Sequence, residues 1–215
     1  MNSATQTATP AVDAVFFDMG GVLLNFHPGR IVSGLLQEQE NREPGIAQTV
    51  CQITLGAPEW RLLDAGCITQ EDATEAMAAR FPRYREEIQL VMQHWPDQMQ
   101  VVDGMYELVS DLKTAGVPLY LLSNASVRFY EYYQRYPIFS LFDGLNISAE
   151  MKLIKPYPEI YRTALKRAGK LPERSLFIDD LEENVRGAQS IGMLGYRFQG
   201  HHQLRCFLTQ LGLFR

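Results

Sequence analysis

Short apolar runs alternate with amphipathic segments along most of the chain. The runs are typical of buried strands and occupy residues 14–17, 117–122, 144–148, 175–178 and 195–198. Between several of them, apolar residues recur at helical spacing, in segments 103–115, 158–168 and 181–191. Alternating strands and helices predict a parallel sheet that is covered by helices on both faces. We therefore expect an α/β fold with a doubly wound, Rossmann-like parallel sheet.

Residues 26–100 break this alternation because they contain no convincing strand. Their apolar spacing predicts helices at residues 28–40, 46–54, 58–65, 70–81 and 83–95. Thr69 and Asp72 resemble a capping box at the start of the fourth helix, with Asp in place of Glu or Gln. An all-helical stretch between the first strand and the rest of the sheet indicates an insertion, which we expect to lie over the carboxyl end of that strand.

These patterns define the expected domain boundaries. We expect a core of residues 12–25 and 101–215, a helical insertion of residues 26–100, and a disordered tail of residues 1–11. The tail lacks the basic segment and the apolar run of a secretory signal. The large apolar residues of the insertion are expected to form its own core rather than to contact a substrate; they are Trp60, Leu62, Leu63 and Met77.

The composition limits the cellular compartments and the classes of binding partner that we expect for this protein. The 215 residues are 46% hydrophobic and carry a net charge of −5, so nothing electrostatic favours nucleic acid or an anionic membrane as a partner. No apolar run approaches the length of a membrane span. Three scattered cysteines fit neither a disulfide framework nor a zinc site and suit a reducing compartment. We expect a cytoplasmic protein that is a monomer or a weak homodimer.

A single carboxylate ends the first apolar run, and two glycines follow closely. Asp18 comes directly after Phe17, and Gly20 and Gly21 lie just beyond it. Asp is a poor strand residue and gains little from an apolar core. The carboxyl ends of strands in an open α/β sheet, by contrast, are where ligands bind. Asp18 is therefore a candidate nucleophile or metal ligand, although Asp-x-Gly is also ordinary turn chemistry.

Two further polar segments follow strand-like runs. Ser123 and Asn124 follow the second predicted strand. The hydroxyl and the next backbone N–H can hold a phosphate oxygen there, or the serine can simply cap a helix. Lys155 precedes Pro156, which pushes its backbone out of the helical region. A lysine at this place can neutralise carboxylates and a phosphate, and the alternative is a solvated surface lysine.

The predicted strand at residues 175–178 ends in an acidic pair. Asp179 and Asp180 repel each other at a strand tip, and a divalent cation relieves this repulsion. Mg²⁺ suits such a site because it prefers a few carboxylates, waters and substrate phosphate. Asn184 lies one turn into the next helix and can orient the pair. The alternative is a helix N-cap with a solvated neighbour, which explains Asp180 better than Asp179.

Taken together, these four segments resemble the haloacid dehalogenase-like hydrolase superfamily over nearly the whole chain from residue 12. The matching positions, in chain order, are Asp18, Ser123, Lys155, Asp179, Asp180 and Asn184. Most members of this superfamily are Mg²⁺-dependent phosphatases that pass through an aspartyl-phosphate. The resemblance also implies that the helical insertion is the family's cap, which excludes water and selects the substrate.

The resemblance implies a role for each matching residue. Asp18 is the expected nucleophile, Ser123 and Asn124 bind the phosphate, and Lys155 balances the charge beside Asp18 and contacts the phosphate. The implied metal ligands are Asp18, the backbone carbonyl of Gly20, Asp180 and, more weakly, Asp179.

Gly20 is the main departure from the phosphatase pattern. The family usually has a second Asp at this position, which acts as the general acid and base, and glycine cannot transfer a proton. A subgroup with Asp-x-Gly-Asn-Val-like motifs, which includes alpha-D-glucose-1-phosphate phosphatases, shows the same gap. His27 and His94 are the candidates to supply the proton instead.

The expected function is therefore that of a Mg²⁺-dependent phosphatase acting on a small phosphorylated metabolite, with a sugar phosphate among the candidates. One alternative is a non-catalytic binding module, which the glycine at position 20 favours. Another is a metal-independent 2-haloacid dehalogenase, which also lacks the second Asp. In a dehalogenase the pair Asp179 and Asp180 would be unexplained and would repel a carboxylate substrate.

Overall fold

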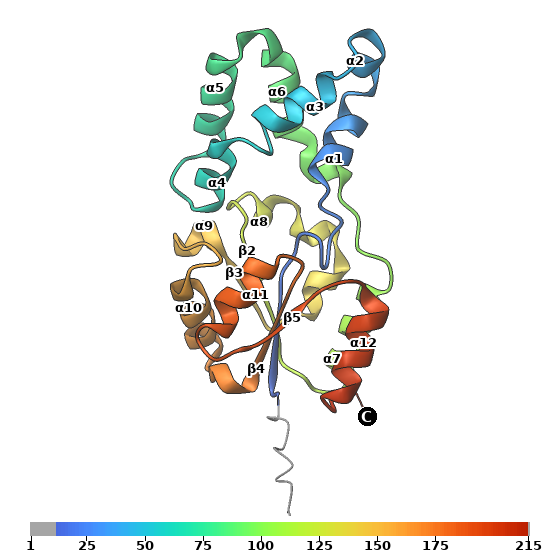
Figure 1. The fold of residues 1–215 in the computed structure, drawn as a ribbon, viewed down its shortest axis with the longest axis vertical. Coiled ribbons are helices and arrows are strands. Elements are labelled where there is room, and N and C mark those ends of the chain that lie inside the picture. The colour runs from blue at the N-terminus through green and yellow to red at the C-terminus, as the bar shows by residue number, and fades with distance from the viewer. Residues whose placement is uncertain (1–11, 215) are drawn as a thin grey trace, which may run out of the picture.

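The chain folds around a five-stranded parallel sheet with the strand order β3-β2-β1-β4-β5. The computed structural model describes residues 12–214 (Figure 1). Its strands are β1 (Ala14–Phe17), β2 (Leu119–Ser123), β3 (Gly144–Ile147), β4 (Ser175–Asp179) and β5 (Leu194–Arg197). The predicted α/β fold is confirmed, and each predicted strand begins or ends within two residues of an observed one. The predicted tail, residues 1–11, lies outside the described residues.

Strand β1 lies at the centre of the sheet and is buried on both faces. It pairs with β2 through Val15 and Leu119, and with β4 through Ala14 and Ser175. Because helices cover both faces of the sheet, side chains on either side of a central strand are buried. The four residues of β1 are therefore all apolar instead of alternating with polar ones.

The two faces of the sheet belong to two separate hydrophobic cores. Val15 and Phe17 point into one core, whereas Ala14 and Phe16 point into the other. The first core includes side chains of α7 (Met105–Thr114) and α12 (His201–Gln210), and the second includes side chains of α10 (Pro158–Ala168) and α11 (Glu182–Gln189). Helices therefore cover both faces, as the doubly wound pattern predicts (Figure 1).

Shorter helical segments connect these elements. The remaining α-helices outside residues 26–100 are α8 (Phe129–Tyr132) and α9 (Ser148–Met151). The 3₁₀ turns are η1 (Pro82–Tyr84), η2 (Trp95–Gln98), η3 (Tyr133–Arg135), η4 (Pro137–Leu141) and η5 (Pro172–Arg174). None of the helices among residues 12–214 combines the length and the apolar character needed to cross a membrane.

Residues 26–100, called the helical lobe below, form only helices and turns beyond the carboxyl edge of the sheet (Figure 1). The helices are α1 (Pro28–Leu35), α2 (Gln37–Arg42), α3 (Ile46–Ile53), α4 (Pro58–Asp64), α5 (Gln70–Arg80) and α6 (Arg85–His94). The capping box is confirmed, since Thr69 and Asp72 each accept a hydrogen bond from the other's backbone N–H. The exact boundaries between this lobe and the core stay a prediction.

The single helix expected over residues 28–40 is wrong, because two helices occupy this segment. The backbone leaves the helical region at Leu36, with φ −109° and ψ 24°. Helix α1 buries Ile31 and Val32, whereas α2 is polar and buries none of its residues. The first helix therefore ends where its apolar stripe ends, and no packed face continues its direction.

One close contact between the lobe and the core lies where the turn after α4 meets α9. Gly66 has a φ of +66°, and a Cβ at this position would lie 2.2 Å from the carbonyl oxygen of Ala149. Two residues earlier, the backbone carbonyl of Asp64 accepts a hydrogen bond from the hydroxyl of Ser148, at 2.5 Å. These contacts fix the end of α4 to the end of β3.

We predict that Gly66→Ala destabilises the protein more than Gly45→Ala. Both glycines have a positive φ, but nothing lies within 4 Å of a Cβ at Gly45. Gly45→Ala therefore costs only the left-handed backbone penalty of about 1–2 kcal/mol. Gly66→Ala must also displace the backbone of Ala149, which adds about 1–3 kcal/mol. Urea unfolding of both variants measures the difference in the free energy of unfolding. Equal losses of stability would mean that the backbone at this contact can move apart without cost.

Candidate active site

Asp18 lies directly after the central strand and is held at its tip. Its backbone N–H donates to the carbonyl of Ile178, and its residue surface is 7% exposed. The chain then turns sharply at Gly21, which has a φ of +76°. A Cβ on Gly21 would lie 2.5 Å from Oδ2 of Asp180, so glycine is required there. Gly20 does not have a positive φ and is not constrained in this way.

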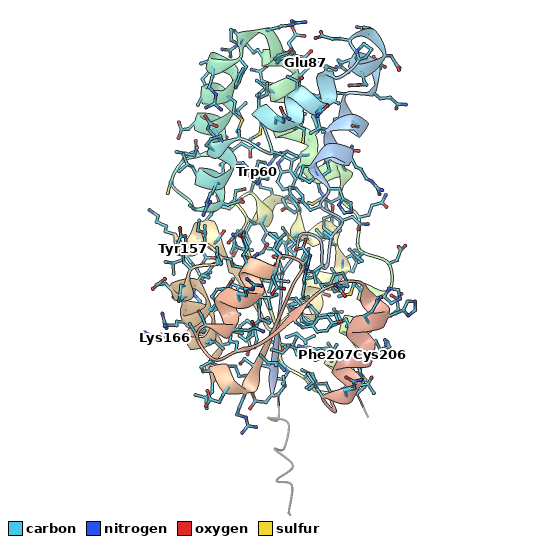
Figure 2. The ribbon with its side chains drawn as sticks, viewed as in Figure 1. Trp60, Glu87, Tyr157, Lys166, Cys206 and Phe207 are labelled. Atoms are coloured by element: carbon cyan, nitrogen blue, oxygen red, sulfur yellow. The ribbon has the colours of Figure 1, made fainter. Side chains whose placement is uncertain are left out.

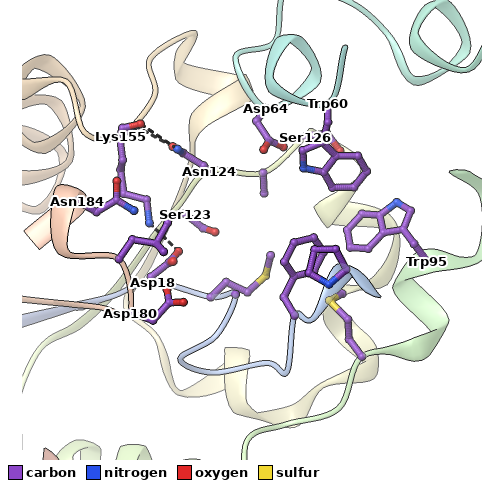
Figure 3. A pocket seen from close by; sticks show the side chains of 17 residues that line it. Asp18, Trp60, Asp64, Trp95, Ser123, Asn124, Ser126, Lys155, Asp180 and Asn184 are labelled. Atoms are coloured by element: carbon purple, nitrogen blue, oxygen red, sulfur yellow. Dashed lines mark hydrogen bonds and ion pairs between the residues drawn. The ribbon is translucent and has the colours of Figure 1, made fainter. Parts of the chain in front are cut away.

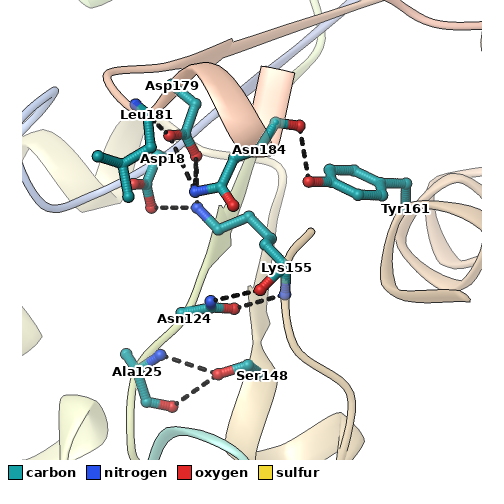
Figure 4. Close-up of polar contacts among 9 residues, drawn as sticks. All are labelled: Asp18, Asn124, Ala125, Ser148, Lys155, Tyr161, Asp179, Leu181 and Asn184. Carbon is teal, nitrogen blue, oxygen red and sulfur yellow. Dashed lines mark hydrogen bonds and ion pairs between the residues drawn. The ribbon is translucent and has the colours of Figure 1, made fainter. Parts of the chain in front are cut away.

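Lys155 is buried and forms an ion pair with two carboxylates, so it is not a solvated surface lysine. Its Nζ lies 2.7 Å from Oδ1 of Asp18 and 2.7 Å from Oδ2 of Asp179. Asn124 holds the lysine backbone, because its Oδ1 accepts the N–H of Lys155 and its Nδ2 donates to the lysine carbonyl (Figure 4). Burial opposes the charging of Lys155, but Asp179 and Asp18 outweigh it and raise its pKa.

The carboxylate of Asp179 is fully buried and already surrounded by hydrogen-bond donors. Besides Lys155, it accepts the backbone N–H of Leu181 at 2.9 Å and the Nδ2 of Asn184 at 3.0 and 3.1 Å (Figure 4). The hydroxyl of Tyr161 donates to the carbonyl of Asn184 and so fixes the start of α11. Asn184 therefore orients Asp179 rather than Asp180.

Three carboxylates gather at this sheet edge and could hold a metal ion. Asp18, Asp179 and Asp180 each offer an oxygen, and these three atoms lie within 4.8 Å of one another. Burial and the charge of Asp179 raise the pKa of Asp18 to about 7, although the charge of Lys155 lowers it. Burial and Asp179 also raise the pKa of Asp180. The site is thus short of positive charge, and an oxygen-ligand set of this kind fits a hard divalent cation.

The site opens into a cavity of about 360 Å³ between the sheet edge and the helical lobe (Figure 3). Its floor carries the polar groups that the sequence predicted; these are Asp18, Gly20, Ser123, Asn124, Lys155, Asp180 and Asn184. The structure therefore brings together residues from the ends of β1, β2 and β4 and from the loop before α10. Of the predicted site residues, Asp179 lies behind this floor, beneath Lys155.

The opposite wall of the cavity is apolar and belongs mainly to the lobe. Phe26, Trp60 and Trp95 form an aromatic cluster with ring centroids 5.0–6.1 Å apart, and Met99 lies beside them on the wall. Trp60 packs against the interior of the lobe as expected, and it also lines this cavity where the lobe faces the sheet (Figures 2 and 3). Leu63 and Met77 do form the interior of the lobe, whereas Leu62 is exposed.

Asp64, the last residue of α4, also lines the cavity and was missed by the sequence analysis. Its carboxylate points into the cavity from the lobe side (Figure 3). Burial and the charge of Asp18 raise the pKa of Asp64 to about 7, with Lys155 opposing. In the sequence it is one acid at a helix end, and nothing there marks its direction.

Neither histidine that was considered as a proton donor lies in this cavity. His27 lines a separate surface pocket together with Asn25 and Arg30. His94 is exposed, and its Nδ1 lies 3.0 Å from Oδ2 of Asp97. Both candidates are therefore wrong on position, and the acid that does reach the cavity is Asp64.

Curated relatives include two phosphatases that match most of the chain. The sesquiterpene phosphatase of Aspergillus oryzae is 27% identical over 183 residues, which cover 85% of this chain and 87% of that protein. The phosphorylated carbohydrates phosphatase of Thermotoga maritima is 24% identical over 187 residues, which cover 85% of this chain and 82% of that protein.

Solved structures with the same fold include a HAD family enzyme and a dehalogenase. A HAD family enzyme from Bacteroides thetaiotaomicron matches with a TM-score of 0.69 at 24% identity, covering 92% of this chain and 98% of its own. That enzyme has also been solved in complex with magnesium and inorganic phosphate. The L-2-haloacid dehalogenase from Xanthobacter autotrophicus matches with a TM-score of 0.64 at 17% identity, covering 93% of this chain and 83% of its own.

A model of one enzyme family spans the strands and loops that build this site. The match covers residues 12–192, from the start of β1 to the end of α11, and so includes every predicted site residue. The chain belongs to the haloacid dehalogenase-like hydrolase family.

Proposed function

We propose that this protein is a Mg²⁺-dependent phosphatase that uses Asp18 as its nucleophile. The observation that carries the proposal is the buried contact of Asp18 with Lys155 at the bottom of a cavity that also contains Asp180 and Ser123. Two relatives that match most of the chain are named as phosphatases, one for sesquiterpenes and one for carbohydrates. These names support hydrolysis of a phosphate monoester and leave the organic group of the substrate open.

In the proposed reaction, a carboxylate oxygen of Asp18 attacks phosphorus while the bond to the leaving oxygen breaks. Water then attacks the aspartyl-phosphate, which releases inorganic phosphate and restores the carboxylate. Lys155 favours the ionised form of Asp18 and orients it through its 2.7 Å contact with Oδ1. The hydroxyl of Ser123 and the backbone of Asn124 face the same floor and bind phosphoryl oxygens.

The donor set at the sheet edge fits Mg²⁺ held by Asp18, Asp180 and the backbone carbonyl of Gly20. When bound, the ion neutralises negative charge on the phosphoryl oxygens. Asp179 has less capacity to bind it, because its oxygens already accept from Lys155, Leu181 and Asn184. Its role is to hold Lys155 in place, and we propose that the helical lobe acts as the cap that excludes water.

The two alternative functions receive less support. The structural likeness to a haloacid dehalogenase shows the fold alone at 17% identity. The negative charge of the three clustered carboxylates would repel a carboxylate substrate. A non-catalytic binding module is favoured by Gly20, yet the buried ion pair of Lys155 and Asp18 beneath an open cavity is what a nucleophile requires.

We predict that Asp18→Asn abolishes turnover of acetyl phosphate with Mg²⁺ while the fold is kept. The amide is nearly isosteric but is a poor nucleophile, so the loss should far exceed tenfold. Asp13→Asn is the matched control, because Asp13 precedes the same strand at its opposite end. Steady-state assays measure the activity of each variant, and urea unfolding checks that its fold is kept. A rate above about a tenth of the wild-type rate in Asp18→Asn would exclude the nucleophile role.

We predict different effects from the two neighbouring acids of β4. Asp180→Asn should raise the Mg²⁺ concentration for half-maximal rate by about tenfold or more, since even partners of metal ligands change affinity by that much. Asp179→Asn should chiefly lower kcat, because it releases Lys155. Mg²⁺ should also raise the unfolding midpoint of the wild type more than that of Asp180→Asn. Full activity in EDTA would contradict the metal assignment.

A further inference from the structure

The cavity has a polar floor and an apolar wall, and this division constrains the substrate. The phosphate must lie on the floor, next to Asp18 and Lys155, if the proposed phosphatase function holds. In an in-line displacement the leaving oxygen points away from the nucleophile. The organic group of the ester is therefore directed from Asp18 toward the helical lobe and its aromatic cluster.

This wall offers few hydrogen-bonding groups to a polar substrate. Phe26, Trp60 and Trp95 present rings to the cavity, and Met99 presents a thioether. The polar side-chain groups on the lobe side, among the residues that line the cavity, are the indole N–H groups and the carboxylate of Asp64, with the Ser126 hydroxyl beside it. A sugar carries several hydroxyls that would lose water without gaining partners here, whereas an apolar group would gain from burial.

We propose that the aromatic wall is a subsite for an apolar organic group, so that the substrates are phosphate monoesters of hydrophobic alcohols rather than sugar phosphates. This proposal rests on the proposed phosphatase function. It identifies the lobe, through Phe26, Trp60 and Trp95, as the part of the chain that selects the substrate.

A series of n-alkyl phosphates from ethyl to octyl tests this subsite. With Mg²⁺, kcat/KM should rise about fourfold per methylene until the cavity is full, which is the fold-change equivalent to about 0.8 kcal/mol per buried CH₂. Glucose 6-phosphate should react more slowly than hexyl phosphate. Trp60→Ala should flatten the rise, and Leu62→Ala, an exposed position on the same helix, should keep it.

Acetyl phosphate separates the possible failures, because it is small and needs no apolar wall. Absence of acetyl phosphate turnover with Mg²⁺ would overturn the phosphatase function itself. Turnover of acetyl phosphate together with a flat alkyl series, or with glucose 6-phosphate as the better substrate, would overturn the subsite alone.

A second, independent observation concerns the proton that an alkyl leaving group needs. The family position for this task is Gly20, which has no side chain to supply it. Asp64 lines the cavity on the lobe side (Figure 3). An in-line leaving oxygen, directed away from Asp18, would point toward this side. Its backbone is fixed to the core by the hydroxyl of Ser148 and by the close approach of Gly66 to Ala149.

The geometry points to Asp64 as the general acid and base of this enzyme, supplied by the lobe in place of the missing residue at position 20. In the first step its protonated carboxyl donates to the leaving alkoxide oxygen as the P–O bond breaks. In the second step the resulting carboxylate takes a proton from the water that attacks the aspartyl-phosphate, which returns Asp64 to its starting state.

Leaving-group dependence distinguishes this role from a structural one. Asp64→Asn should lower kcat/KM for hexyl phosphate by about 10²- to 10⁴-fold. It should leave kcat/KM for acetyl phosphate nearly unchanged, because kcat/KM reports the first chemical step and acetate needs no proton to leave. Glu71→Gln, an exposed acid at the start of α5, is the control. Equal losses on both substrates would show that Asp64 only shapes the site, and no loss on either would exclude the role.

The pH profile gives a second readout. Asp64 must be protonated to donate, and its pKa is raised to about 7 by burial and Asp18. Asp18, Lys155 and Tyr132 are the charged or titratable groups that interact with it. With hexyl phosphate and saturating Mg²⁺, deprotonation of Asp64 should make kcat/KM of the wild type fall on the alkaline side of its pH profile. Persistence of this fall in Asp64→Asn would contradict the assignment.

Restoring the family's acid at position 20 provides a rescue. A Cβ on Gly20 would lie 3.3 Å from the Cβ of Phe26, so a side chain fits after a shift of a few tenths of an ångström. Gly20→Asp added to Asp64→Asn should recover turnover of hexyl phosphate. Recovery would show that the variant had lost a proton donor, whereas a folded double variant without recovery would contradict that reading.

Discussion

The buried ion pairs of Lys155 with Asp18 and Asp179 are the contacts on which the site depends. Removing three charges from water costs several kcal/mol per ion, and the cost is recovered only when each charge is paired and hydrogen-bonded. Asn124 meets this need for the lysine backbone, and Asn184 meets it for Asp179. The arrangement still leaves excess negative charge around Asp180, and this excess gives the site its capacity for a cation.

The sheet order places these groups together. Strand β1 lies between β2 and β4, so residues that follow these three neighbouring strands share one edge. Asp18, Ser123 and Asp179 are each more than fifty residues from one another in the sequence, yet parallel pairing fixes their relative height. The alternate residues of β1 enter two cores, so the strand cannot shift without exposing one of them. Packing on both faces thus holds the carboxylate of Asp18 in position.

The sequence analysis could predict the core and the floor of the site because their signals are local. A buried run that ends in Asp18, or in the pair Asp179 and Asp180, is visible without knowledge of the partners. The lobe carries no such signal. Whether Trp60 and Asp64 face solvent, the lobe interior or the cavity depends on how the lobe sits on the core, which is set by contacts such as Gly66 with Ala149. Helical periodicity also missed the break at Leu36, since both halves have helix-forming residues.

The glycine at position 20 explains why the core and the helical lobe would contribute different groups to the reaction. Most of the proposed machinery belongs to the core, but a core without an acid at this position can expel only leaving groups that need no proton. If Asp64 supplies that proton, the reaction of an alkyl ester requires the lobe to be seated, and the same seating places the aromatic wall against the organic group. Substrate recognition and proton transfer would then both depend on how the lobe is placed on the core, to which the contact between the end of α4 and α9 contributes. An ester that does not fill the wall would lose both binding and access to the acid, so selectivity would be expressed in kcat as well as in KM.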